Sequence, residues 1–156
     1  MNLMKVLDMI KPAGLVYAHC DIPCGIYDPH AAQMAAQTVL RMSKFIQEKK
    51  SDAHAMARLV AVKEEHAEIC KHEIRVIWGD YFKPEHLQKS PSLHETVWKI
   101  MKAASKARQE SDVASAEQLV DAVNVFAEMF WGSKGVRTYK AKPYPTEKEI
   151  VLPKFV

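Results

Sequence analysis

The sequence lacks the features that mark several protein classes. No stretch of 18 apolar residues occurs in it, so no segment is expected to span a membrane. The net charge is only +3 and both signs are interspersed along the chain, which gives no basic surface for nucleic acid. The chain contains neither a Gly-x-x-x-x-Gly-Lys phosphate-binding loop nor a Gly-x-Gly-x-x-Gly dinucleotide fingerprint. We therefore expect neither a membrane nor a nucleic acid as partner.

Cysteine and the common histidine motifs are also scarce. Three cysteines at these positions make no disulfide framework, and Cys70 falls on an apolar helical stripe, so we expect it to be buried. No glutamate has a histidine three residues later, which excludes the carboxylate-bridged di-metal site of helical bundles. No His-Glu-x-x-His motif occurs either. Six histidines are therefore interpreted as helix-surface or packing residues: His30, His54, His66, His72, His86 and His94.

One short run of the chain concentrates metal-binding side chains. Residues 19–29 read His-Cys-Asp-Ile-Pro-Cys-Gly-Ile-Tyr-Asp-Pro, and thiolate and imidazole are strong ligands for late transition metals. Gly25 is expected to shape this loop through a close backbone approach or a positive φ. Structural zinc is disfavoured, because no second pair of ligands follows at a suitable spacing. Taken alone, Cys20 and Cys24 are equally compatible with a reactive dithiol, a local disulfide or two buried cysteines.

The residues before this run indicate proteolytic processing. Val-Tyr-Ala at residues 16–18 is the kind of small-residue ending that often precedes a cleavage site. Cleavage after Ala18 would make His19 the N-terminus and add its free amine to the ligand set. Two charged residues and a proline interrupt the apolar part of residues 1–18, which favours a cytoplasmic pro-segment over a secretory signal. A cytoplasmic location is therefore expected, with export as the alternative.

The run at residues 19–29 resembles the amino-terminal nickel hook of the nickel superoxide dismutases, whose pattern is H-C-D-x-P-C-G-x-Y-D-P, at every fixed position. Residues 78–84 resemble the link between the family's second and third helices, and Phe130-Trp131 resembles the end of its last helix. The resemblance extends over about residues 19–134. It implies a nickel-dependent enzyme that converts superoxide to oxygen and hydrogen peroxide by one-electron cycling of the metal.

The resemblance also implies the residues of the site. His19 would bind nickel through its amine and imidazole, Cys20 through its thiolate and backbone amide, and Cys24 through its thiolate. Tyr27 and Tyr81 would lie at the open side of the metal, where they order water and limit access to small anions. The family further implies a homo-oligomer, most likely a hexamer, in which a neighbouring subunit covers the hook, and a dedicated peptidase that removes the leader.

Two positions depart from the family pattern. The best-known members hold the axial histidine with a glutamate from the first helix and an arginine from the second. The aligned residues here are Ala35 and His66. The surroundings of the His19 imidazole must therefore differ, and the candidate replacements are His66, Glu65 and Gln33.

The remaining sequence predicts an all-α fold, an up-down-up-down four-helix bundle with an N-terminal metal-binding hook. The expected helices cover about residues 29–50, 52–78, 92–109 and 112–131. Asp28 and Asp52 are the expected caps, and Gly79 and Gly132 the expected stops. A Ser-x-x-Glu capping box at residues 92–95 is expected to open the third helix.

These elements divide the chain into three parts. Residues 1–18 form the leader, residues 19–135 the hook and bundle, and residues 136–156 a tail with three prolines. No stretch alternates convincingly as a strand. The tail is therefore expected to be an extended arm, which packs on a neighbouring subunit, or a disordered end.

A function from another class remains open at this point. A thiol redox or metal-delivery protein could use Cys20 and Cys24 as a dithiol pair. Such a protein would need no cleavage of the leader, and two thiols would titrate in the full-length chain. A purely structural helical module would leave the match at residues 19–29 unexplained.

Overall fold

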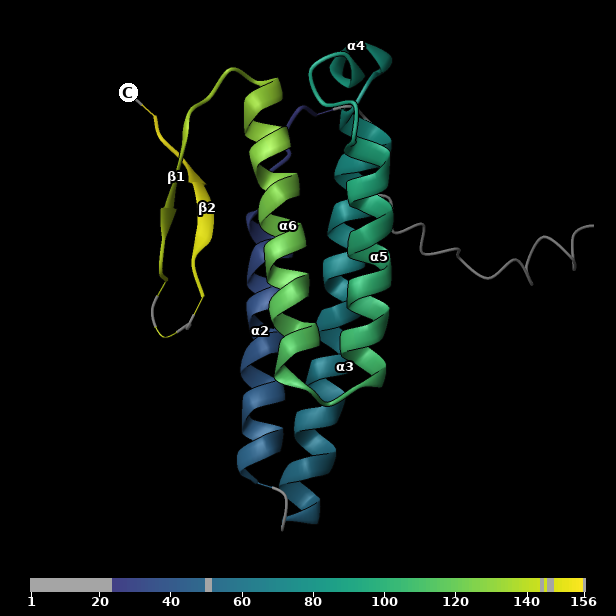
Figure 1. The fold of residues 1–156 in the computed structure, drawn as a ribbon, viewed down its shortest axis with the longest axis vertical. Helices are drawn as coiled ribbons and strands as arrows, with labels where there is room; N and C mark the ends of the chain where they lie inside the picture. The colour runs from purple at the N-terminus through teal and green to yellow at the C-terminus, as the bar shows by residue number, and fades with distance from the viewer. Residues whose placement is uncertain (1–23, 50–51, 144, 146–147, 156) are drawn as a thin grey trace, which may run out of the picture.

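The computed structural model describes residues 24–49, 52–143, 145 and 148–155. Four long helices dominate them: α2 (His30–Glu48), α3 (Ala53–Val76), α5 (Leu93–Gln109) and α6 (Val113–Ser133). They run alternately down and up, and each lies against two neighbours, in the order α3, α2, α6, α5 and back to α3 (Figure 1). The predicted four-helix bundle is confirmed. No helix of the described ranges is long and apolar enough to cross a membrane.

An aspartate side chain starts α3, as predicted, and another starts α6, which was not predicted. The carboxylate of Asp52 accepts a hydrogen bond from the backbone N–H of Ala55 at 2.9 Å, and that of Asp112 accepts one from the N–H of Ser115 at 2.7 Å. Asp28 accepts from the N–H of His30 at 2.8 Å, directly at the base of the hook. The capping box at Ser92 was a wrong prediction, because the Ser92 side chain makes no capping hydrogen bond.

The two predicted glycine stops were also wrong. The chain continues through Gly79 in one wide turn, the π-helix η1 (Ile77–Tyr81), which is closed by the Phe82 N–H to the Ile77 carbonyl at 3.3 Å. Helix α6 likewise continues through Gly132 to Ser133, and the chain turns only at Gly135, where φ is +70°. A short helix, α4 (Pro84–Leu87), follows η1 at the end of the bundle that carries the hook (Figure 1).

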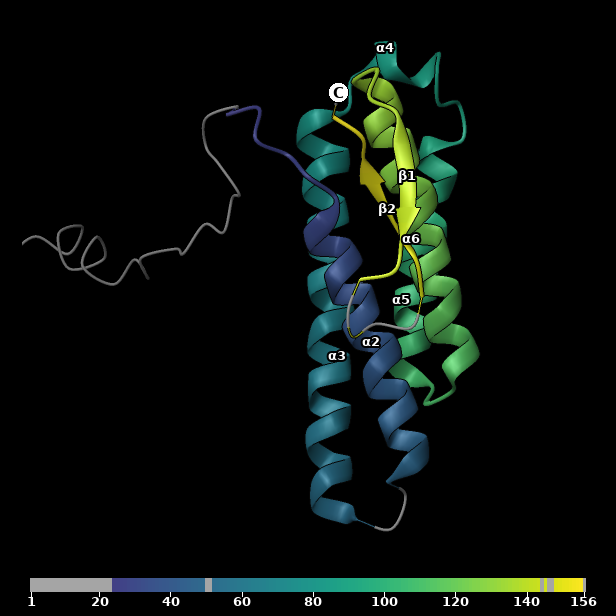
Figure 2. The same cartoon turned by 90° about the vertical axis from the view of Figure 1, so that its left-hand side faces the viewer.

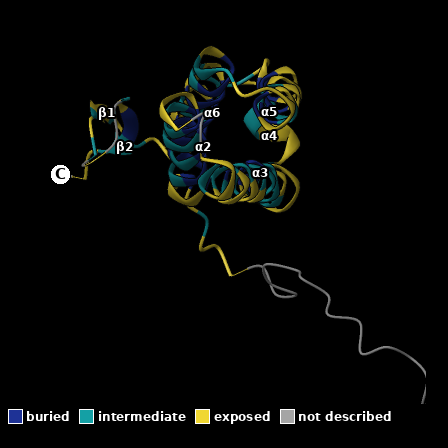
Figure 3. Ribbon diagram, turned by 90° about the horizontal axis from the view of Figure 1, so that it is seen from below, coloured by how far each residue is buried: buried dark blue, intermediate teal, exposed yellow. Residues whose placement is uncertain are grey.

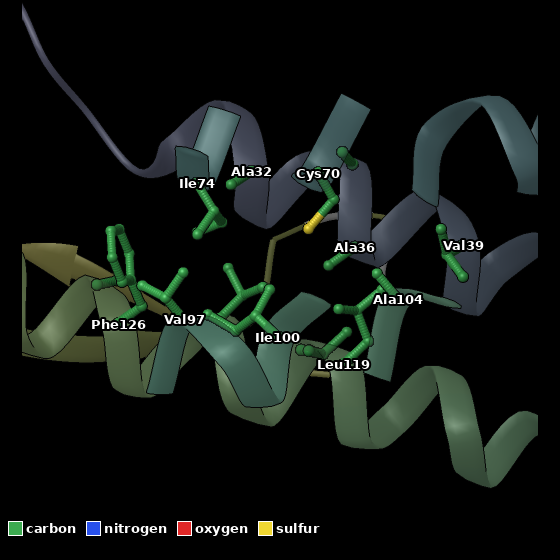
Figure 4. Close-up of a cluster of buried hydrophobic side chains, with 14 of the residues drawn as sticks. Ala32, Ala36, Val39, Cys70, Ile74, Val97, Ile100, Ala104, Leu119 and Phe126 are labelled. Atoms are coloured by element: carbon green, nitrogen blue, oxygen red, sulfur yellow. The ribbon is translucent and has the colours of Figure 1, made fainter. Parts of the chain in front are cut away.

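The core of the bundle is built from small and medium-sized side chains of all four long helices. Figure 4 shows Ala36, Cys70, Ile100 and Leu119, from α2, α3, α5 and α6 in turn, directed toward one another. Alanines on α2, α3, α5 and α6 are fully buried and allow the helices to approach closely. The prediction that Cys70 is a core residue is confirmed.

One charged side chain is buried inside the bundle. Lys63 of α3 is 1% exposed, and its ammonium group donates hydrogen bonds to three backbone carbonyls where α5 ends. The acceptors are the carbonyl oxygens of Ala107 at 2.9 Å, Arg108 at 3.1 Å and Glu110 at 2.6 Å. Burial lowers the pKa of Lys63 from its ordinary value of 10.5. The ammonium thus supplies the donors that the last carbonyls of a helix lack.

The tail forms a β-hairpin, which differs from both expectations for it. Strands β1 (Thr138–Ala141) and β2 (Ile150–Pro153) pair in antiparallel fashion, with Tyr139 opposite Leu152. The hairpin lies outside the ring of helices, beside α2 and α6 (Figures 2 and 3). Ile150 and Val151 are each 1% exposed. The tail is therefore packed on its own bundle.

Amide side chains of the helices replace the missing third strand beside β2. The Gln33 side chain donates to the Val151 carbonyl at 2.8 Å, and the Asn124 side-chain oxygen accepts from the Val151 N–H at 3.2 Å. Asn124 also donates to the Glu149 carbonyl at 2.9 Å, and Gln37 donates to the Lys148 carbonyl at 2.7 Å. Backbone groups that an edge strand would leave unpaired are therefore satisfied within the chain.

Candidate metal centre

The described part of the hook begins at Cys24 and leads directly into α2. The Cys24 thiol is exposed, and its sulfur accepts from the N–H of Ile26 at 3.4 Å. Gly25 has a φ of +74°, which confirms the predicted positive value and turns the chain toward Tyr27. The other predicted ligands, His19 and Cys20, lie outside the described residues. An exposed thiol on a short loop fits the requirement for a thiolate ligand that reaches a metal without distorting the bundle.

The two predicted site tyrosines lie next to each other, although 54 positions separate them in the sequence. The ring centroids of Tyr27, from the hook, and Tyr81, from η1, are 5.7 Å apart and the rings are tilted by 52°. Both line a pocket of ≈ 300 Å³ together with Gly25, Asp80, Lys83, Glu85 and His86. The wide turn at η1 brings Tyr81 to this position, so the helix that continues past Gly79 shapes the pocket.

His86, which the sequence suggested only as a surface or packing residue, is part of the same pocket. Its ring stacks on Tyr81 with 5.3 Å between centroids and 9° between planes. Its Nδ1 atom accepts a hydrogen bond from the backbone N–H of Lys83 at 3.0 Å. Nδ1 therefore carries no proton, and the neutral ring holds its hydrogen on Nε2. No signal in the sequence distinguished His86 from the other surface histidines.

The end of α6 supplies the other side of this aromatic cluster. The Tyr81 hydroxyl lies 2.8 Å from the Ser133 hydroxyl, and the Phe130 ring lies 4.9 Å from the Tyr81 ring. The Lys134 ammonium sits 4.9 Å from the centroid of Tyr81 and 5.1 Å from that of Phe130. A cation at this distance is attracted by the ring faces. These contacts join residues about 50 positions apart, and no pattern in the sequence pointed to Ser133.

The residues considered for the axial histidine lie in different surroundings. Ala35 is buried, and Gln33 is committed to the tail. His66 is half-buried, and its Nδ1 atom lies 2.9 Å from the Val62 carbonyl, so Nδ1 carries a proton there and Nε2 is the remaining ring nitrogen. Glu65 is exposed. Donor groups of both Gln33 and His66 thus already have protein partners.

Cys70 has no part in the hook. It is completely buried, and burial raises its pKa to about 12, so its thiol stays protonated. Among the residues that the structure describes, no three histidine, cysteine, aspartate or glutamate side chains gather to form a second metal site. The hook therefore offers the donor set that suits a soft transition metal.

Comparisons with known proteins agree with the hook and the bundle. The model of the family described as nickel-containing superoxide dismutase matches residues 15–134. The chain is 40% identical over 129 residues to the protein named superoxide dismutase [Ni] of Streptomyces coelicolor, and this match covers 81% of the chain and 95% of the relative. The protein of the same name from Streptomyces seoulensis gives the same identity and coverage.

Solved structures show the same fold. The native nickel superoxide dismutase structure superposes with a TM-score of 0.72 at 38% identity, over 75% of this chain and 99% of that one. The structure of the apo form superposes with a TM-score of 0.69 at 35% identity, over 71% of this chain and 99% of that one. The family match ends at residue 134, before the hairpin of β1 and β2. By sequence and by fold, the chain belongs to the nickel-containing superoxide dismutase family.

Proposed function

We propose that this nickel superoxide dismutase holds its metal through His19, Cys20 and Cys24. The observation that carries the proposal is the agreement of residues 19–29 with the nickel-hook pattern at every fixed position, in a chain that matches the family over residues 15–134. Nickel bound there supplies the one-electron cycle between Ni(II) and Ni(III) that oxidises one superoxide and reduces another. The exposed thiol of Cys24 suits a ligand role, whereas the buried, protonated thiol of Cys70 does not.

The family resemblance implies the ligand atoms, and the chemistry of the hook is compatible with them. Thiolates of Cys20 and Cys24 donate negative charge and favour the higher oxidation state of the metal. The amine and imidazole of His19 and the backbone amide of Cys20 supply the nitrogen donors. Square-planar nitrogen and sulfur coordination is a geometry that Ni(II) accepts. The chain therefore needs no ligand from the helices.

Tyr27 and Tyr81 are proposed to form the wall between the metal and solvent. Their rings lie 5.7 Å apart at a pocket of ≈ 300 Å³, large enough for superoxide and a few water molecules. The lining carries Lys83 together with the carboxylates of Asp80 and Glu85, so the small size of the pocket, rather than its charge, is proposed to select for superoxide. In this role the tyrosines exclude larger molecules and order water, and neither acts as a nucleophile.

Removal of residues 1–18 is proposed to be part of maturation. An amide-blocked His19 nitrogen is a poor ligand, so the active form would begin at His19, after a leader-cleaving peptidase has acted. The interrupted apolar pattern of the leader supports cleavage of a cytoplasmic pro-segment. Export remains the alternative outcome of a localisation experiment.

We also propose that the active form is a homo-oligomer, most likely a hexamer. The described part of the hook makes few contacts with its own bundle: Cys24 and Gly25 are exposed, and Ile26 is 76% exposed. So short a loop cannot bury a core of its own. A neighbouring copy that covers Ile26 would hold the hook in shape around the metal.

The test is intact mass combined with metal analysis of the purified protein, produced with its maturation peptidase. We expect a chain that starts at His19, about one nickel per chain and dismutase activity. Cys24→Ser should abolish nickel binding and activity with the helical content unchanged, whereas the matched Cys70→Ser variant should keep both. Equal activity of the uncut chain, or loss of nickel in Cys70→Ser with retention in Cys24→Ser, would overturn the ligand assignment.

A further inference from the structure

Two short oxygen–oxygen distances fix the direction of a hydrogen-bond chain at the pocket. The Ser133 hydroxyl lies 2.6 Å from the backbone carbonyl of Phe130 and 2.8 Å from the Tyr81 hydroxyl. A carbonyl oxygen can only accept, so the single Ser133 proton must lie toward Phe130 at that distance. Ser133 is then left as the acceptor for Tyr81. The order of donation is Tyr81 to Ser133 to the Phe130 carbonyl.

This order decides where the Tyr81 hydroxyl proton points. It is directed at the end of α6 and is therefore not offered to the pocket. The Tyr81 ring is held on its faces and edges as well, by His86 stacked at 5.3 Å and by Phe130 at 4.9 Å. What Tyr81 presents to Tyr27 is its ring, at 5.7 Å and 52°. The two tyrosines thus have different parts in the same pocket.

We propose that Ser133 is a positioning residue of this enzyme, which acts through Tyr81 on the hook tyrosine Tyr27. By accepting the Tyr81 proton, Ser133 holds the Tyr81 ring as a fixed wall against which Tyr27 packs. The proposal rests on the proposed role of Tyr27 and Tyr81 at the nickel pocket. It adds Ser133, which contacts Tyr81 without lining the pocket itself and which the sequence did not single out.

The chain itself offers a matched control for this role. Ser43 in α2 is fully buried and donates to the carbonyl of Val39 at 2.9 Å, a helical back-bond of the same kind as that from Ser133 to Phe130. No aromatic hydroxyl is recorded as its partner among the described residues. Ser43→Ala removes a similar hydroxyl from the bundle without touching a tyrosine. A merely structural effect of losing a helical serine should therefore appear in both variants.

The experiment is a double-mutant cycle on the mature nickel enzyme. Ser133→Ala should lower kcat/KM for dismutation by about three- to tenfold, the range that corresponds to one neutral hydrogen bond. Tyr81→Phe should cause a similar loss, and the double variant should be no worse than Tyr81→Phe alone, because Ser133 acts only through the missing hydroxyl. Ser133→Thr, which keeps the acceptor oxygen, should stay within about twofold of wild type, and so should Ser43→Ala.

A second readout does not depend on turnover. The measurement is an NMR spectrum of the metal-free chain with ring-labelled tyrosine. The signals of Tyr81 and Tyr27 are assigned by their loss in Tyr81→Phe and Tyr27→Phe. Ser133→Ala should shift both signals. Ser43→Ala should leave both signals in place. If only the Tyr81 signal moved and the Tyr27 signal stayed unchanged, the proposal that Ser133 positions Tyr27 through the Tyr81 ring would be contradicted.

The outcomes separate this proposal from the proposed function. A mature wild-type chain that binds nickel and is active, together with an unaffected Ser133→Ala, overturns the role of Ser133 alone. The same holds if Ser133→Ala lowers activity equally in the wild-type and Tyr81→Phe backgrounds, or if Ser133→Thr loses as much as Ser133→Ala. A correctly cleaved wild-type chain with neither nickel nor activity overturns the proposed site and the role of Ser133 in it.

Discussion

The buried ammonium of Lys63 allows the sharpest test of what holds the bundle together. The change is Lys63→Met, which keeps the length and most of the volume of the side chain and removes only its charge and its donors. In the folded chain the three acceptors at the end of α5 stay where they are. The variant therefore asks whether the hydrogen bonds of Lys63 outweigh the cost of burying its charge.

The structure sets the expected magnitude. Each hydrogen bond from a charged donor contributes about 1.5–3 kcal/mol to stability, net of the hydrogen bonds to water that it replaces. Three of them therefore contribute about 4.5–9 kcal/mol. Arg108 and Glu110 are exposed, so their carbonyls can rebind water, whereas Ala107 is fully buried and its carbonyl is left without this donor. The loss then falls mainly at Ala107, and we expect the free energy of unfolding to drop by about 3 kcal/mol.

Urea unfolding followed by circular dichroism, at one fixed protein concentration, measures this difference. Lys99→Met is the matched control, since the Lys99 ammonium lies on the surface 2.7 Å from the Glu95 carboxylate and should contribute within about 0.5 kcal/mol. A Lys63→Met variant as stable as the wild type would refute the reasoning, because desolvation of the ammonium would then outweigh its hydrogen bonds.

The pH dependence of Lys63 gives an independent check. Its pKa is lowered in the folded chain, so between that value and 10.5 the unfolded chain binds more protons than the folded one. Stability from this group therefore rises with pH across that window. The rise should be missing in Lys63→Met.

Three further predictions concern other parts of the chain. Asp112 has a pKa of about 2, below its ordinary 3.8, because the Ser115 hydroxyl and N–H donate hydrogen bonds to its carboxylate. Its contribution to stability should therefore be complete above pH 3.8 and be lost as the pH falls toward 2. Asp112→Ala should remove this part of the acid sensitivity, measured by the midpoints of urea unfolding at each pH. In the folded metal-free chain at neutral pH, a thiol reagent should modify Cys24 and leave Cys70 unmodified until the chain unfolds, because burial raises the pKa of Cys70 to about 12. Asn124→Leu removes two hydrogen bonds to the hairpin and should release it. Hydrogen exchange at the Val151 amide should then accelerate at least tenfold, which corresponds to a loss of more than about 1.4 kcal/mol. Amides in the middle of α6 should stay protected.

The helices could be predicted from the sequence where a local rule decided them. Asp52 caps α3 with its own carboxylate, so a few neighbouring residues were sufficient there. Gly79 and Gly132 were misread as stops because glycine ends a helix only where the chain turns, and the turn occurs at Gly135. At Gly79 the chain instead widens into η1.

The hairpin could not be predicted from a local pattern. Each strand has only four residues, and β2 is held by Gln33, Gln37 and Asn124, which lie far away in the sequence. Strands stabilised in this way show little alternation of their own, because the helices that cover them decide which residues are buried.

The candidate site likewise contains residues that could be predicted from the sequence and residues that could not. The motif at residues 19–29 could be recognised without a structure, and so could the two tyrosines, because the family resemblance includes them. Ser133 and His86 could not, because their part in the pocket depends on a distance to Tyr81 and on which atom carries a proton.

The hydrogen bond from Gln33 to Val151 joins two residues 118 positions apart, near the two ends of the described chain. On the ribosome the first turns of α2 emerge long before β2, because helices α3, α4, α5 and α6 lie between them in the sequence. The four helices can therefore assemble while the hairpin is still absent, and the side of α2 that carries Gln33 closes only once β2 has emerged. Any partner that binds the nascent chain would thus meet α2 with this side still open, whereas in the complete fold the hairpin covers it.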